Sequence, residues 1–324
     1  RLAGEDSRRG TFAHRHAALV DYETGEVWMP LDHLPGADGS RFWVYDSLLS
    51  EYAALGFEYG YAQESPETLV MWEAQFGDFI NCAQVVVDQY LVAAEDKWGQ
   101  RNGLVLLLPH GYHGQGPEHS SARIERFLTA AAEDNIQVVQ PTTAAQFFHL
   151  LRRQVYTERH TPLIVFTPKE GLRMKQTRSP IDEFTSGSFQ EILDDPGIGD
   201  PDAVERVIFC TGKIAWEAIA ERDKREASVA VVRIEQLYPL PQEQLLTLLK
   251  RYPNARQLVW LQDEPENMGA WSFIEHRVWR VKDMGYDLRH VTRVESGSPA
   301  TGSKAIHDQE HADLMDAAFA PWED

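Results

Sequence analysis

The chain has 324 residues, of which 43% are hydrophobic and 25% charged, as in an ordinary globular protein long enough to form two domains. Its net charge is −19, from 31 basic and 50 acidic residues, so nucleic acid and anionic membrane surfaces are poor candidate partners. Its two cysteines, Cys82 and Cys210, argue against a disulfide framework or a cysteine-based zinc site and predict a reducing compartment.

Nothing in the sequence reads as a membrane-spanning segment. The longest apolar run, Leu104 to Leu108, is the size of a strand and far shorter than the ~20 residues that span a bilayer. No secretory signal opens the sequence. The first residue is Arg1 and not Met, which indicates a fragment or a processing product.

The first part of the chain offers a candidate acid on a helix. Residues up to Asp38 are rich in turn formers and predict an arm. Glu51 then begins a predicted helix with small and apolar residues at 53–56. A carboxylate among such neighbours is partly desolvated, which raises its pKa and suits proton exchange with a ligand nitrogen. The alternative is a solvated first-turn Glu that stabilises the helix dipole.

Short apolar segments alternate with helical ones over most of the chain. The predicted strands, which read as strands covered on both faces, are 103–110, 136–140, 162–167, 206–211, 229–234 and 257–262. Helices are predicted at 143–156, where Thr143 and Gln146 form a capping pair, at 241–251, and at the tail, Lys304 to Phe319. This alternation predicts an α/β protein with mostly parallel sheets flanked by helices.

A domain boundary is expected in the acidic, aperiodic stretch 191–204. It divides the chain into a first domain, 1–195, and a second, 196–324.

Histidines cluster in the segment PHGYHGQGPEH, residues 109–119, directly after the strand that ends near His110. Active sites of parallel sheets lie outside the carboxyl ends of the strands, so this loop is a candidate site. His119 is expected to open the helix that follows, whose N-terminus would favour an anion. The alternative for each histidine is a hydrogen bond to nearby backbone. A metal site is disfavoured because no carboxylate or Cys stands at a ligand spacing.

Several strings together resemble the decarboxylating component of 2-oxoglutarate dehydrogenase complexes. The most specific are MWEAQFGDF at 71–79 and PHGYHGQGPEHSSAR at 109–123. The stretches GEDSRRGTFAHRH, SLLSEYAALGFEYGYA, VRIEQLYPLP and DEPENMGAW are also similar to the family. The resemblance covers nearly the whole chain. It implies a transketolase-like pyrimidine-binding domain at 1–195 and a transketolase C-terminal-like domain at 196–324.

The resemblance also implies site residues and a cofactor, thiamine diphosphate. Glu51 matches the acid that hydrogen-bonds the aminopyrimidine ring and activates the cofactor. Leu49 and Phe79 match residues that line the pyrimidine pocket, with Gln75 beside them. His119 matches a histidine that faces 2-oxoglutarate and the reaction intermediate, and His110 is a second candidate for substrate binding.

The resemblance also implies an upstream half of the protein and further partners. No diphosphate motif is found here, so the ligands of Mg²⁺ are expected in an upstream half, and no metal ligand is assigned in this chain. The family implies a homodimer that works with a dihydrolipoyl succinyltransferase, in the bacterial cytoplasm or, in a eukaryote, the mitochondrial matrix. Without its upstream half the chain is expected to be inactive.

Two alternatives stay open. The chain could instead be the beta-type subunit of a two-chain 2-oxoacid dehydrogenase, because that subunit has the same two domains. A non-catalytic module for dimerisation and scaffolding is the other. These residues alone do not indicate whether the substrate is 2-oxoglutarate or 2-oxoadipate.

Overall fold

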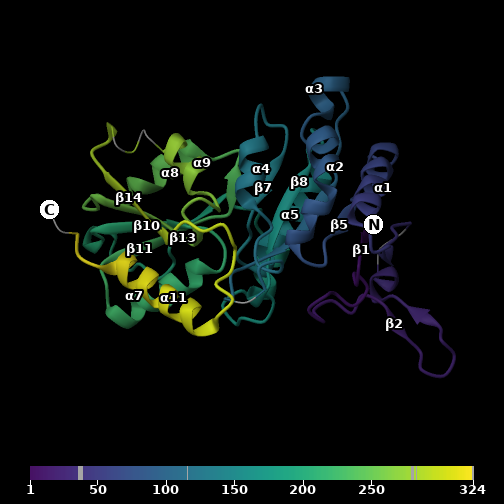
Figure 1. Ribbon diagram of the computed structural model, residues 1–324, viewed down its shortest axis with the longest axis horizontal. Helices are drawn as coiled ribbons and strands as arrows, with labels where there is room; N and C mark the ends of the chain where they lie inside the picture. Colours follow the sequence, from purple (N-terminus) through teal and green to yellow (C-terminus); the bar gives the residue numbers. More distant parts are fainter. Residues whose placement is uncertain (36–38, 115, 279–280, 282, 323–324) are drawn as a thin grey trace.

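Two mostly parallel sheets, each flanked by helices, organise the molecule (Figure 1). The computed structural model describes residues 1–35, 39–114, 116–278, 281 and 283–322. The part of the chain coloured purple to teal forms one body, and the green to yellow part forms a second body beside it (Figure 1). The predicted fold class, α/β with two helix-flanked sheets, is confirmed.

The first sheet has the order β12-β7-β8-β6-β5-β1-β4. Its strands are β1 (Leu2–Gly4), β4 (Val44–Asp46), β5 (Met71–Glu73), β6 (Val105–His110), β7 (Gln137–Val139), β8 (Leu163–Pro168) and β12 (Gln236–Tyr238). All pairs are parallel except that of β12 with β7. The apolar run of β6 is buried at every position, as expected for a strand with helices on one face and further packing on the other.

The helices of this domain cover the two faces of the sheet unequally. They are α1 (Glu51–Glu64), α2 (Gln84–Val86), α3 (Ala94–Trp98), α4 (Ile124–Ala130), α5 (Ala144–Tyr156) and α6 (Ile181–Thr185). Leu104, Leu106 and Leu108 share one core with residues of α1 to α4, whereas Val105 and Leu107 share another with residues of α5. Alternate side chains of β6 therefore enter different cores, as strand geometry requires.

The second sheet has the order β14-β13-β10-β11-β9. Its strands are β9 (Ile192–Leu193), β10 (Arg206–Cys210), β11 (Val229–Ile234), β13 (Gln257–Pro265) and β14 (Asp287–Arg293), and only β9 is antiparallel to its neighbour. The associated helices are α7 (Ile214–Arg225), α8 (Gln242–Leu249), α9 (Trp271–Arg277) and α11 (Lys304–Phe319). The tail helix lies within its predicted bounds.

The two domains share strands across the expected boundary. β9 precedes residue 195 and pairs with β11 of the second sheet, whereas β12 follows it and pairs with β7 of the first. The division at 195 and 196 stays a prediction, and the second domain contributes an edge strand to the first sheet.

The predicted opening arm is wrong for Leu2–Gly4. These residues form β1, a buried strand between β5 and β4, because Leu2 and Ala3 add two apolar side chains to the sheet. The hairpin of β2 (Leu19–Val20) and β3 (Val27–Trp28) does project from the body (Figure 1). None of the helices that the structure describes is both long and apolar enough to cross a membrane.

Candidate active site at the strand ends of the first sheet

The candidate site residues lie where parallel strands of the first sheet end. Glu5 and Asp6 follow β1, Gln75 and Phe79 follow β5, and the loop that contains His119 follows β6. Parallel strands present their carboxyl ends at one edge, which brings residues far apart in sequence together. Of the predicted residues, Phe79 and His119 contact each other at this edge, and Gln75 hydrogen-bonds Asp6 there.

Glu51 is the first residue of α1, as predicted. The helix starts there because Ser50 stands at the N-cap, and its hydroxyl accepts a hydrogen bond from the Ala53 backbone N–H at 3.3 Å. Glu51 is half-buried, and Leu49, two residues earlier, is 75% exposed. Burial and then the negative charges of Asp6 and Glu51 raise the pKa of Glu5, so the three carboxylates lie near one another.

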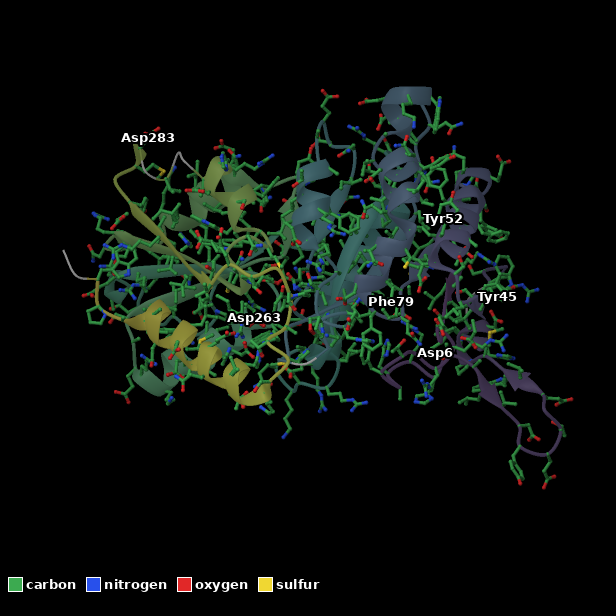
Figure 2. The ribbon with its side chains drawn as sticks, viewed as in Figure 1. Asp6, Tyr45, Tyr52, Phe79, Asp263 and Asp283 are labelled. Atoms are coloured by element: carbon green, nitrogen blue, oxygen red, sulfur yellow. The ribbon has the colours of Figure 1, made fainter. Side chains whose placement is uncertain are left out.

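Gln75 links this carboxylate group to the segment after β5. Its side-chain amide donates to Asp6 Oδ2 at 3.1 Å, and Figure 2 shows Phe79 and Asp6 in the same part of the first domain. Phe76 and Phe79 are only partly buried, whereas Trp72, within β5, is 1% exposed. Trp72 therefore belongs to the core, and the two phenylalanines keep part of their rings accessible to a ligand.

His119 packs against these two phenylalanines. Its ring centroid lies 4.3 Å from that of Phe76 and 5.6 Å from that of Phe79, both edge to face. In the described part of the chain, no partner hydrogen-bonds the ring nitrogens of His119. The structure thus brings Phe79 and His119 together, with an imidazole that keeps its capacity to bind a ligand.

The prediction that His119 opens a helix is wrong. α4 begins only at Ile124, and Arg123 before it has a left-handed φ of 61°. The backbone N–H groups of Ser120 and Ser121, which a helix start at His119 would direct along its axis, donate instead to Asp78 Oδ1 at 3.2 and 3.0 Å. His119 therefore lies in a loop, and the expected anion site at a helix N-terminus is absent there.

Asp78 and Lys169 also contact the loop that contains His119, and the sequence patterns indicated neither of them. Asp78 is in the 3-10 helix η2 (Gly77–Ala83), directly between the two phenylalanines, and is 6% exposed. Lys169 follows β8, and its ammonium group donates to the backbone carbonyl of His119. Lys169 lies just beyond the predicted strand 162–167, but nothing in the sequence connects either residue with the loop that contains His119.

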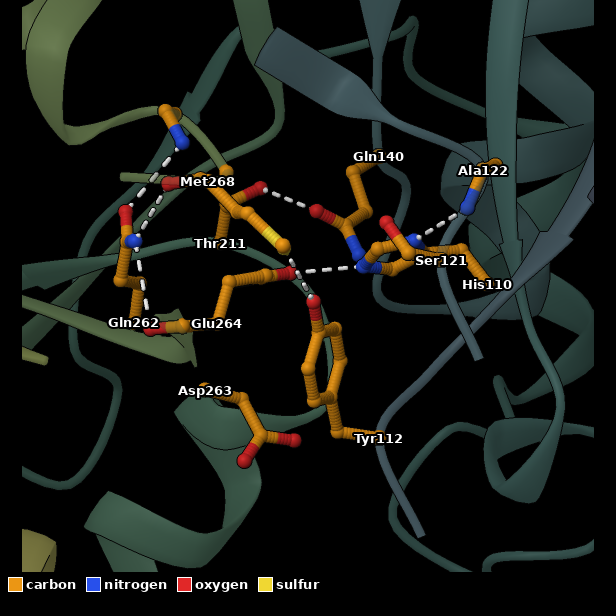
Figure 3. Close-up of polar contacts among 12 residues, drawn as sticks. His110, Tyr112, Ser121, Ala122, Gln140, Thr211, Gln262, Asp263, Glu264 and Met268 are labelled. Atoms are coloured by element: carbon orange, nitrogen blue, oxygen red, sulfur yellow. Dashed lines mark hydrogen bonds and ion pairs between the residues drawn. The ribbon is translucent and has the colours of Figure 1, made fainter. Parts of the chain in front are cut away.

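His110, at the other end of the same loop, is bound into the interface with the second domain. It is 3% exposed, its Nε2 lies 2.6 Å from Glu264 Oε1, and its Nδ1 accepts from the Ala122 N–H at 3.1 Å (Figure 3). Both ring nitrogens are therefore engaged within the protein. The structure does not bring His110 together with Phe79 and His119 in one cluster of contacts.

The same interface contains further paired polar groups. Lys213 Nζ lies 2.7 Å from Asp263 Oδ2, and Arg293 donates to Asp263 Oδ1 at 2.8 Å. Burial opposes ionisation of Asp263, but the charges of Lys213 and Arg293 outweigh it and lower the pKa of this carboxyl. Tyr112 and Met268 also cross between the domains, with the Tyr112 hydroxyl 3.3 Å from the sulfur (Figure 3).

A largely apolar pocket of about 340 Å³ lies on the α5 side of the first sheet, beneath the opening segment. It contains the buried carboxylate Glu73, which accepts two hydrogen bonds from Arg15, at 2.7 and 2.6 Å. The pairing ties the segment before β2 to the end of β5. Among the described residues no group of three or more His, Cys, Asp and Glu side chains could hold a metal ion.

Comparison with known proteins identifies both halves of the chain. Residues 1–175 match the transketolase pyrimidine-binding domain family, and residues 178–319 match the 2-oxoglutarate dehydrogenase C-terminal family. The 2-oxoglutarate dehydrogenase E1 component of Cupriavidus necator is 49% identical over 99% of this chain, and that of Shouchella clausii is 50% identical over 97%. A multifunctional 2-oxoglutarate metabolism enzyme of a Mycobacterium is 45% identical over 99%.

These similarities cover only part of each relative. The chain spans 34% of the length of the first two proteins and 26% of the mycobacterial one. Within that span the match is continuous through both domains, which agrees with the two sheets of the fold. The chain therefore belongs to the family of 2-oxoglutarate dehydrogenase E1 components, as a transketolase-type pyrimidine-binding domain followed by the C-terminal domain.

Proposed function

We propose that this chain forms the aminopyrimidine side of a thiamine diphosphate site and, with further parts of the protein, decarboxylates 2-oxoglutarate. The observation that carries the proposal is the group of half-buried residues at the strand ends of the first sheet, in a chain similar to E1 components over its full length. Glu51 is the acid of this site, Leu49, Gln75 and Phe79 surround the cofactor ring, and His119 faces the substrate.

The residues present fit a pyrimidine ring better than a diphosphate. A flat aminopyrimidine needs apolar contact on its faces and a carboxyl group at a ring nitrogen. The exposed side chain of Leu49, the partly exposed ring of Phe79 and the carboxyl of Glu51 are of these kinds. Glu5 and Asp6 close by are acidic and would repel a diphosphate. We propose that the diphosphate and Mg²⁺ are held by residues outside this chain.

Two side chains of this site, Glu51 and His119, have separate roles in the proposed reaction. Thiamine diphosphate, when bound, supplies the electron sink for loss of carbon dioxide from a 2-oxo acid. Glu51 shares a proton with a nitrogen of the pyrimidine ring. A carboxyl group can do this because its oxygen donates a hydrogen bond when protonated and accepts one when ionised. His119 donates a hydrogen bond or a proton to the substrate from an imidazole that is braced on two aromatic rings.

We also propose partners and a location for the full-length protein. These are a homodimer, a dihydrolipoyl succinyltransferase that receives the succinyl group, and a cytoplasmic location, which the bacterial relatives support. Exposed apolar side chains before and within α1 support contact with another chain or domain, since Leu48 is 76% exposed and Phe57 61%.

Carbon dioxide release from 2-oxoglutarate tests the proposal. The full-length protein, with Mg²⁺ and an artificial electron acceptor, should release carbon dioxide with thiamine diphosphate and not without it. The 324-residue chain alone should bind thiamine diphosphate weakly and release none. A parallel assay with 2-oxoadipate distinguishes the two substrates. Substantial turnover by the chain alone would contradict the assignment of the diphosphate and Mg²⁺ to other parts of the protein.

A further inference from the structure

The peptide bond that follows His119 is fastened on both sides by residues from other strand ends. On one side, the His119 carbonyl accepts a hydrogen bond from Lys169, after β8. On the other, the Ser120 N–H of the same peptide group donates to Asp78 Oδ1 at 3.2 Å, and the next N–H, of Ser121, donates to the same oxygen at 3.0 Å. A peptide plane held at both its N–H and its C=O cannot rotate without breaking a hydrogen bond.

Asp78 is also placed rigidly relative to the ring of His119. It lies in η2 between Phe76 and Phe79, the two side chains that contact the imidazole. Gly77 permits η2 to approach this closely, because an added Cβ would lie 2.4 Å from the Cβ of Ala122 and 2.6 Å from the carbonyl oxygen of Pro109. One short segment therefore supports both the backbone after His119 and its ring.

The charged groups of Lys169 and Asp78 are both partly removed from water. Burial lowers the pKa of Lys169 to about 8, against the opposing effect of Asp78 and Glu170, and it raises the pKa of Asp78. The second carboxylate oxygen of Asp78 is buried without a hydrogen-bond partner in the described part of the chain. Groups that are this poorly solvated are tolerated when they serve a specific purpose.

We propose that Lys169 and Asp78 are positioning residues for His119 and hold its imidazole toward the substrate. This inference rests on the role of His119 in the proposed function. Neither residue is required to touch the substrate. Their contribution is to confine the 119–120 peptide, and a displacement of about 1 Å at a reacting group can reduce a rate about a hundredfold.

A double-mutant cycle in the full-length enzyme tests this coupling. Lys169→Met should lower kcat roughly tenfold, with half-saturation by thiamine diphosphate unchanged. In an enzyme that already carries His119→Ala, the same change should alter kcat by less than about twofold, because coupled residues are not additive. Lys97→Met is the matched control: Lys97 also donates to a backbone carbonyl, of Gln89 at 2.6 Å, but on α3, and kcat should be unchanged.

A pair of variants at Asp78 covers the case in which Lys169→Met does not fold. Asp78→Asn keeps the oxygen that accepts from Ser120 and Ser121 and should retain kcat within about threefold, whereas Asp78→Ala should lose roughly tenfold. The Asp78→Ala loss should also vanish in the His119→Ala background. Equal factors in both backgrounds, or unchanged kcat in both Lys169→Met and Asp78→Ala, would overturn the proposal.

Hydrogen exchange separates failure of this inference from failure of the proposed function, because it requires no turnover. In the full-length protein, Asp78→Ala should make the amides of Ser120 and Ser121 exchange roughly tenfold faster, with α1 and β13 unchanged. If exchange rises but the wild type does not decarboxylate 2-oxoglutarate, the assigned reaction fails and the restraint on the loop stands. Unchanged exchange at these two amides would refute the restraint itself.

Discussion

Two regions of this molecule contain a carboxylate and a histidine. They differ in burial and in whether these side chains are hydrogen-bonded to each other. At the strand-end edge of the first sheet, Glu51 and His119 are half-buried and retain bonding capacity. At the interface between the domains, His110 and Glu264 are buried and bonded to each other at 2.6 Å. The first region therefore suits a ligand, and the second suits cohesion of the two domains.

The comparison separates two histidines that are nine positions apart, His110 at the end of β6 and His119 in the loop after it. Their positions in the sequence do not distinguish them as substrate-facing candidates, since both lie at or beyond the end of the same strand. The structure directs His110 to the second domain and leaves His119 against Phe76 and Phe79. Changes in the first region should thus affect catalysis before stability, and changes in the second should affect stability before catalysis.

The largest expected effect is at Glu51. Glu51→Gln in the full-length enzyme should lower turnover about a hundredfold or more, because an amide cannot share a proton with a ring nitrogen. The direct measurement is proton exchange at the thiazolium carbon of the bound cofactor. Glu64→Gln, an exposed change at the other end of α1, is the control and should leave exchange intact. Normal exchange in Glu51→Gln would show that Glu51 does not activate the cofactor and only stabilises the first turn of α1.

A smaller effect is expected at the interface, and it should appear in stability. Glu264→Ala leaves the buried His110 Nε2 without its partner, which costs about 1–3 kcal/mol. Thermal unfolding should therefore begin at a lower temperature, while proton exchange at the cofactor, measured well below that temperature, stays near the wild-type rate. A variant that keeps its Tm but loses cofactor exchange would assign Glu264 to the reaction and break the comparison.

The smallest effect concerns pH and the Arg15–Glu73 pair. Burial alone would raise the pKa of Glu73, but hydrogen bonds from Arg15 and His14 outweigh it and lower that pKa below its usual value of 4.5. A carboxyl whose pKa is lower in the folded state stabilises the fold above its ordinary pKa and loses that contribution as the pH falls through the folded value. Tm should accordingly fall more steeply below about pH 4.5 in the wild type than in Glu73→Gln. Parallel slopes would show that the pair adds no pH-dependent stability.

Several strands could be predicted because they contain short apolar runs, whereas β14, DLRHVTR, was not predicted because polar and charged side chains interrupt it. The runs at 105–110 and 229–234 are buried at every position, and only a strand covered on both faces needs that composition. β1, β4 and β5 were not predicted; each has only three residues, which shows little periodicity, although β7 of the same length was predicted. β12 was missed because its pairing with β7 depends on the packing of the two domains.

The candidate site was predictable in part for a similar reason. The resemblance and the strand end both pointed to the loop that contains His119. Asp78 and Lys169 could not be found by spacing, because they meet the loop from positions about 40 to 50 residues away through backbone groups. The backbone N–H groups of Ser120 and Ser121 bind Asp78, which is also why the helix predicted to start at His119 begins later.

The two histidines allow the most direct test of this comparison, in which the strand-end edge of the first sheet serves catalysis and the interface between the domains serves stability. Turnover, thiamine diphosphate affinity and Tm should be measured side by side on full-length His119→Ala and His110→Ala. We expect His119→Ala to lose on the order of a hundredfold in turnover with Tm and affinity retained. His110→Ala should instead lower Tm and keep the greater part of turnover below its unfolding transition. The opposite pattern, with turnover lost in His110→Ala at unchanged Tm and kept in His119→Ala, would contradict the account.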